Sequence, residues 1–136
     1  MSVHNKLKAA KNQLDRAIKL FFDEADYYSA ATLAGASEDI LGKMLEAQGK
    51  KHALKSISSA IVEILRAADA PTLENKKLIE QLNDVRDWLK HYIGGKDLEF
   101  DAKEAASALI DRAVSNYYQL TKDQSAEMIR FTSQQE

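Results

Sequence analysis

The stretch DYYSAATLAGASEDILGKMLEAQG, residues 26–49, predicts a long amphipathic helix. Asp26 can cap its start, because a short acidic side chain accepts hydrogen bonds from the free amides of a first turn. Gly49 suits the left-handed position at which many helices end. Apolar or small side chains recur at helical spacing at positions 30, 33, 34, 37, 41, 44 and 45. The small residues at positions 30, 31 and 34–36 further predict that a neighbouring element approaches this helix closely.

The same periodicity predicts helices on both sides of this stretch. A first helix is expected to follow a cap at Ser2 and to end near residues 23–26. A third helix carries apolar residues from Leu54 to Ala68. Pro71 is expected to end it, because the residue before a proline is pushed out of helical geometry.

Two more helices follow the proline. One is expected to begin after a cap at Thr72 and to end at Gly94 and Gly95, where two permissive residues release the chain. The next opens with Asp101, which has Glu104 three residues later, the spacing of a capping box.

Five amphipathic helices joined by short turns predict an all-α fold. We expect an antiparallel, mostly up-and-down bundle of four to five main helices, with a short C-terminal helix over about residues 123–130. A chain of 136 residues fits one domain, which we place at residues 1–131, with residues 132–136 as a tail.

Composition excludes several kinds of site. The chain has no cysteine, so it has no disulfide, no thiolate metal site and no cysteine nucleophile. None of its three histidines follows a glutamate by three residues, as the metal sites of helical bundles require, so we expect no metal and no cofactor. The net charge is -2 and no apolar stretch has the length of a membrane span, so we expect a cytoplasmic protein with no membrane partner.

Adjacent aromatic residues indicate a homodimer. Neighbours on a helix point about 100° apart, so one core stripe seldom takes both rings of a pair. The second ring then either lies half exposed or enters an interface, where aromatic residues are enriched, and we expect the interface. The pairs are Phe21 and Phe22, Tyr27 and Tyr28, and Tyr117 and Tyr118.

One run in the fourth helix, RDWLKH at residues 86–91, looks like chemistry. Asp87 and His91 are four residues apart, so they share a helix face, and the carboxylate can orient the imidazole. Arg86 and His91 are five apart, about 140° around the helix, so they diverge within one chain. Two such helices crossing at a two-fold axis would bring each arginine to the other chain's histidine. Alternatively, these are ordinary charges at a helix end.

A phosphodiester between two such motifs can be cleaved without metal. One histidine takes a proton from a ribose 2′-hydroxyl, another protonates the departing oxygen, and arginine stabilises the phosphate charge. This chemistry favours RNA as the substrate. Lysines that can attract its backbone are Lys90, Lys96, Lys50, Lys51 and Lys55.

The run from Arg86 to His91 resembles the signature of the HEPN superfamily, an arginine followed by a polar residue, three others and a histidine. That resemblance implies a helical bundle whose dimer brings two signatures together, and a metal-independent endoribonuclease, often a toxin or defence component with an antitoxin protein as partner. It assigns phosphate binding to Arg86, the polar position to Asp87 and acid-base chemistry to His91.

The resemblance has one departure and leaves two alternatives. Some such toxins are neutralised by modification of a tyrosine two positions after the histidine, but here that position is Ile93, so this control is not carried over. A non-catalytic HEPN-like module that binds a protein, a nucleotide or RNA is the second hypothesis. A helical protein that docks a partner on its aromatic surface is the third.

Overall fold

The computed structural model describes residues 1–53, 55, 60, 63–64, 75–92 and 94–134. Throughout these residues the regular elements are helical, which confirms the predicted all-α class. They are α1 (Lys6–Lys19), the π-helical turn η1 (Leu20–Glu24), α2 (Tyr27–Ala47), α4 (Asn75–Lys90), α5 (Ala102–Thr121) and α6 (Ala126–Ser133). The helix expected from Leu54 to Ala68 falls largely outside the described residues. Its end at Pro71 and the cap at Thr72 lie wholly outside them.

Two of the predicted helix starts are confirmed and one is wrong. The amide of Ser29 donates to Asp26 Oδ1 over 3.2 Å at the start of α2, and the amide of Glu104 donates to Asp101 Oδ1 over 2.9 Å at the start of α5. Helix α1 is capped by Asn5 and not by Ser2. Asparagine caps a helix as well as serine does. Asn5 directly precedes the first helical residue, so its side chain accepts a hydrogen bond from the amide of Lys8, whereas the residues after Ser2 are not yet helical.

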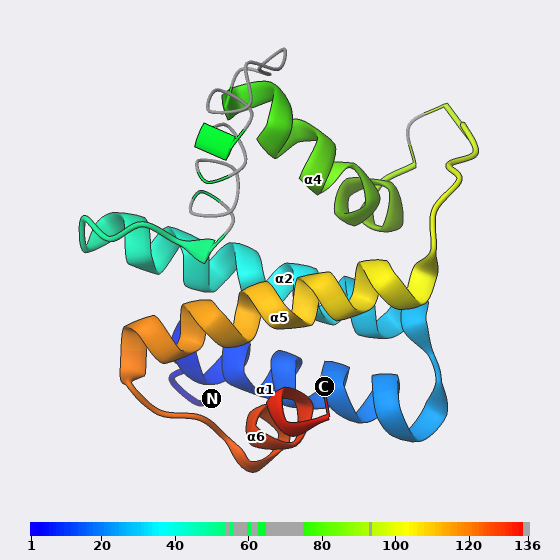
Figure 1. Ribbon diagram of the computed structural model, residues 1–136. Helices are drawn as coiled ribbons and strands as arrows, with labels where there is room; N and C mark the ends of the chain where they lie inside the picture. Colours follow the sequence, from blue (N-terminus) through cyan, green and yellow to red (C-terminus); the bar gives the residue numbers. More distant parts are fainter. Residues whose placement is uncertain (54, 56–59, 61–62, 65–74, 93, 135–136) are drawn as a thin grey trace.

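The core lies between α1, α2 and α5, and α6 closes it from the side of α1. In Figure 1, α2 and α5 lie next to each other in the middle of the molecule, α1 and α6 lie below them, and α4 lies above. Helix α1 runs antiparallel to α2, and α4 runs antiparallel to α5 (Figure 1). The largest fully buried apolar side chains are Phe131, Leu14, Ile18, Leu41, Leu45, Ile110 and Met128.

Helix α4 contacts α2 at Gly35, where α2 has no side chain. A Cβ atom on Gly35 would lie 2.7 Å from Cγ of Arg86, so the Arg86 stem rests directly on the glycine backbone. This confirms the close approach predicted for the small residues of α2. One turn later, Leu89 is partly buried against the core.

The end of α4 differs from the prediction. The helix ends at Lys90 and not at Gly94 and Gly95, although both glycines adopt positive φ of 73° and 64°. Tyr92, which is three residues after Leu89 and would share its face in a longer helix, is 88% exposed. In the described part of the chain nothing apolar covers Tyr92, so the end of α4 lacks the packing that would extend the helix to this residue.

Helix α6 begins and ends later than expected. Ser125 caps it, because its hydroxyl accepts the amide of Met128 over 3.2 Å. Thr132 and Ser133 belong to the helix and not to a tail, and their hydroxyls bond back to the carbonyls one turn earlier. Buried Phe131 holds this last turn on the core. None of the described helices has the length and hydropathy needed to cross a membrane.

The second rings of the adjacent aromatic pairs have different surroundings. Phe22 packs edge-on against Phe21, and the guanidinium of Arg130 lies 4.7 Å from the centre of the Phe22 ring, so this pair is covered within one chain. Tyr28 is 61% exposed and Tyr118 48% exposed. These two rings are therefore the ones available to a second molecule.

Candidate functional site

Arg86 extends from α4 towards α2 and meets carboxylates there. Its Nη1 lies 3.4 Å from Oε2 of Glu38 and 4.0 Å from Oδ1 of Asp39. Its Nε lies 3.8 Å from Oδ1 of Asp87 on its own helix. The Arg86 side chain is only 14% exposed. Arg86 is therefore a partly buried, ion-paired residue and not a free surface cation.

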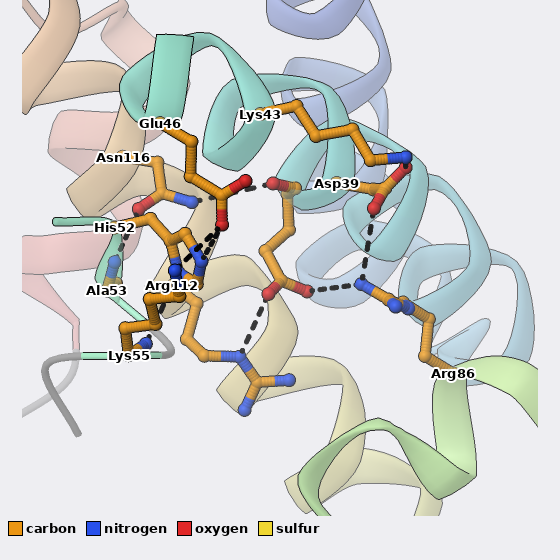
Figure 2. A network of polar contacts seen from close by, with 10 residues as sticks. Asp39, Lys43, Glu46, His52, Ala53, Lys55, Arg86, Arg112 and Asn116 are labelled. Carbon is orange, nitrogen blue, oxygen red and sulfur yellow. Dashed lines mark hydrogen bonds and ion pairs between the residues drawn. The ribbon is translucent and has the colours of Figure 1, made fainter. Parts of the chain in front are cut away.

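Glu38 links Arg86 to a second arginine. Its other oxygen, Oε1, lies 3.5 Å from Nε of Arg112 on α5, without the alignment of a hydrogen bond. Glu38 is 4% exposed and Arg112 7% exposed at the side chain. Burial lowers the pKa of Arg112, and the negative charge of Glu38 opposes that lowering. Figure 2 shows Arg86 and Arg112 reaching this place from different helices.

A second polar cluster lies beside this one, at the end of α2. The ring of His52 bonds Oε1 of Glu46 through Nε2 over 2.9 Å, and its Nδ1 accepts the amide of Lys55 over 3.2 Å. Nζ of Lys55 lies 3.3 Å from the same Glu46 oxygen. Burial raises the pKa of Glu46, but the hydrogen bonds from Lys55 and His52 outweigh it, so its pKa is lowered overall. Figure 2 shows the three side chains meeting.

The two clusters line one hollow of about 180 Å³, and both Lys55 and Arg86 are among its lining residues. Lys50 and Lys51, the other lysines of the predicted patch, precede Lys55 in the chain and are exposed at the surface. The buried amide of Asn116 ties this segment to α5, because its Oδ1 accepts the amide of Ala53 over 2.8 Å. Of these three lysines, Lys55 lines the hollow that Arg86 also lines.

His91 opens on a different and larger hollow, of about 860 Å³, at the end of α4. His91, Lys90 and Lys96 are all exposed there. The indole of Trp88 donates to the carbonyl of Lys96 over 2.8 Å, which fixes the loop after α4 against the helix. The described residues that line it are Asp84, Asp87, Trp88, Leu89, Lys90, His91, Tyr92, Gly95, Lys96, Asp97 and Leu98.

The expected pair of Asp87 and His91 does not form. No hydrogen bond or ion pair joins their side chains, both of which lie in the described part of the chain; the contact between them is the His91 amide donating to the Asp87 carbonyl over 3.0 Å. Four-residue spacing aligns side chains only inside a helix, and His91 lies just past the end of α4. Asp87 instead lies close to Arg86.

The structure thus divides the motif between two hollows. Arg86 lines the smaller and His91 the larger, in agreement with the angle of about 140° between them on a helix. Sequence reasoning missed Glu38 and Arg112, and it did not assign Trp88 and Tyr92 to the site. A glutamate at position 38, on the buried face of α2 between Ala34 and Leu41, is the signal that could have been read.

The larger hollow has the groups for acid-base chemistry on an anion. Its imidazole can accept or donate a proton, its two lysines can attract phosphate, and its aromatic rings offer faces for stacking. Three aspartates at its edge limit the positive potential. Among the described residues, no group of three or more His, Asp and Glu side chains is placed to hold a metal ion. Comparisons of the chain with protein-family models, curated proteins and solved structures find no match.

Proposed function

We propose that this protein is a HEPN-like, metal-independent endoribonuclease whose active site is completed by a second copy of the chain. The observation that carries the proposal is the exposed hollow at the end of α4, where His91 stands beside Lys90 and Lys96. Trp88 is 41% and Tyr92 88% exposed at the same place. Exposed cations next to exposed rings are the combination that binds single-stranded nucleic acid.

The reaction follows from two copies of this hollow facing each other. One His91 removes the proton of a ribose 2′-hydroxyl, whose oxygen attacks the adjacent phosphorus. The second His91 protonates the 5′-oxygen as its bond to phosphorus breaks, which leaves a 2′,3′-cyclic phosphate and a 5′-hydroxyl. Lys90 and Lys96 stabilise the phosphate charge. The proposal keeps the toxin or stress role with an antitoxin partner, as the resemblance implies.

The surroundings of Arg86 favour a second candidate, a HEPN-like module that binds RNA, a nucleotide or a protein without cleaving it. Arg86 already pairs with Glu38 and lies within 4.0 Å of Asp39, so less of its charge is available to a phosphate. It also lines the smaller hollow and not the one with His91. A catalytic role for Arg86 therefore requires a partner chain to bring substrate to it.

Cleavage in the presence of a chelator distinguishes the two candidates. We expect the protein to cut single-stranded RNA in EDTA, with 2′,3′-cyclic phosphate ends detected by mass spectrometry. His91→Ala should lower the cleavage rate at least about 100-fold, the typical contribution of a general acid-base group. RNA binding by fluorescence anisotropy should change much less.

A matched control keeps this test specific. His4 is exposed at the other end of the chain, and His4→Ala should cut RNA as the unaltered protein does. If the unaltered protein and His91→Ala bind RNA with the same affinity and neither cuts it, the binding module is supported and the ribonuclease is contradicted.

A further inference from the structure

Glu38 is buried, charged and not part of the motif. It lies on the face of α2 that meets both α4 and α5, where its two oxygens reach different arginines. We propose that Glu38 is the positioning residue of the R-x4-H motif: it holds Arg86 against Arg112 and thereby fixes the C-terminal half of α4 on the bundle. Its consequence for RNA cleavage rests on the proposed function, but the positioning itself does not.

Charge balance explains why a carboxylate is needed at this place. Arg86 and Arg112 bring two positive charges to side chains that are 14% and 7% exposed. Glu38 supplies one negative charge between them, and Asp39, at the rim, lies 4.0 Å from Arg86. Without the carboxylate of Glu38, two like charges would remain in a poorly hydrated place. Arg112 would lose its ion pair with Glu38, and Arg86 would keep only Asp39 at 4.0 Å and Asp87 at 3.8 Å, which is costly. The repulsion would then be relieved by movement of the arginine that the fold holds less firmly.

Arg86 is that residue. Arg112 is the more buried of the two and stands in the middle of α5, which packs along the core. Arg86 belongs to α4, whose described contacts with the core are the Arg86 stem on Gly35 and the partly buried Leu89. Loss of the Glu38 charge is therefore expected to loosen α4 and leave α1, α2 and α5 in place.

Loosening α4 would move the larger hollow. Lys90 is four residues after Arg86, and His91 follows it directly. Trp88, on the same last turns, fixes the loop that carries Lys96. The position of Arg86 therefore sets where the imidazole and both lysines stand relative to the rest of the molecule.

Hydrogen exchange tests the positioning without any RNA. In Glu38→Gln, we expect the amides of residues 80–90 to exchange about tenfold faster or more, because their local opening becomes easier, while amides in α1 and α5 change less than about threefold. Glu46→Gln is the matched control, since Glu46 stands two turns later on α2 and pairs with His52 and Lys55. It should leave residues 80–90 unchanged. Unaltered exchange in α4, or equal acceleration in all helices, would overturn the proposal.

A second variant covers the case in which Glu38→Gln does not fold. Arg86→Gln removes the other end of the link but leaves Glu38 paired with Arg112, and the same acceleration in residues 80–90 is expected. Where both variants fold, combining them should accelerate exchange no more than Glu38→Gln alone, because the two residues act through one contact. Fully additive effects would contradict the link.

Activity gives the remaining readout. If the protein cuts RNA, Glu38→Gln should lower kcat about tenfold while KM changes less than about threefold, because the lysines remain and only their placement relative to the imidazole is lost. Glu38→Asp should recover part of kcat. If the protein cuts no RNA, the proposed function fails and the exchange result still decides the role of Glu38. Normal kcat with fast exchange in α4 would overturn its role in placing the motif.

Discussion

The carboxylate of Glu38 pairs with two arginines, Arg86 and Arg112. Removing one partner of a buried ion pair is more damaging than the pair itself is stabilising, because the remaining charge stays buried without compensation. Glu38 has two such partners, and one of them, Arg86, is also the first residue of the motif. A residue that is predicted from the motif to bind phosphate is thus also a residue that holds α4 on α2.

The contact between Arg86 and Gly35 can be tested by adding a single methyl group at position 35. In Gly35→Ala the added Cβ would lie 2.7 Å from Cγ and 3.0 Å from Cδ of Arg86, so the arginine stem must move. We expect the free energy of unfolding to fall by about 1–3 kcal/mol, the usual cost of overpacking. Urea denaturation followed by circular dichroism measures it.

The control stands two turns later on the same helix. A Cβ on Gly42 would meet His52 and Asn116 at 3.6 and 3.7 Å, which is ordinary contact. Gly42→Ala should therefore be neutral or stabilise by up to about 1 kcal/mol, because alanine is the better helix former. Equal destabilisation by both substitutions would show that the Arg86 stem is not tightly packed on Gly35.

At the scale of the helices, α2 packs against both α1 and α5 over many residues, whereas the described contacts between α2 and α4 are fewer. The last turns of α4 depend on Arg86 on Gly35, on Leu89, and on the loop held by Trp88. The candidate site therefore stands on a helix that the described residues hold less extensively than α2 holds α1 and α5. A site built at a locally less stable element is common where a ligand or a second chain completes it.

The start of α2 gives a prediction for acid. Hydrogen bonds from the hydroxyl and amide of Ser29 lower the pKa of Asp26 below its ordinary value. The unfolded chain then binds a proton more readily than the folded protein does, so the stability from this cap is complete above about pH 4 and is lost as the pH falls below it. Thermal denaturation of Asp26→Asn should show a smaller loss of Tm between pH 5 and pH 3 than the unaltered protein. An identical pH profile would contradict the role of the Asp26 charge.

Local signals account for what could be predicted of these helices. Asp26 and Asp101 bond amides three residues away, so the sequence contains both partners within one turn. The predicted end of α4 was wrong because the length of the helix depends on whether Tyr92 packs against another element, which is a tertiary property. Glu38 was missed because Arg86 is 48 residues away, and no periodicity in the sequence relates the two.

At the scale of the whole molecule, one chain presents one His91, and its Arg86 lines another hollow. Cleavage by two imidazoles needs a donor and an acceptor on opposite sides of the phosphate, so a single chain lacks half of the groups. The exposed rings of Tyr28 and Tyr118 are available for contact with a second copy. A two-fold arrangement would supply the second imidazole and present the same surface twice.

Mixing subunits tests the shared active site most directly. The unaltered protein and His91→Ala are mixed in varied proportions at constant total concentration, left to exchange subunits, and assayed for RNA cleavage in EDTA. If both imidazoles of a dimer are needed, activity falls with the square of the unaltered fraction, so an equal mixture retains about one quarter of it. Retention of about one half, as independent chains would give, or an unaltered protein that cuts no RNA, would contradict the shared site.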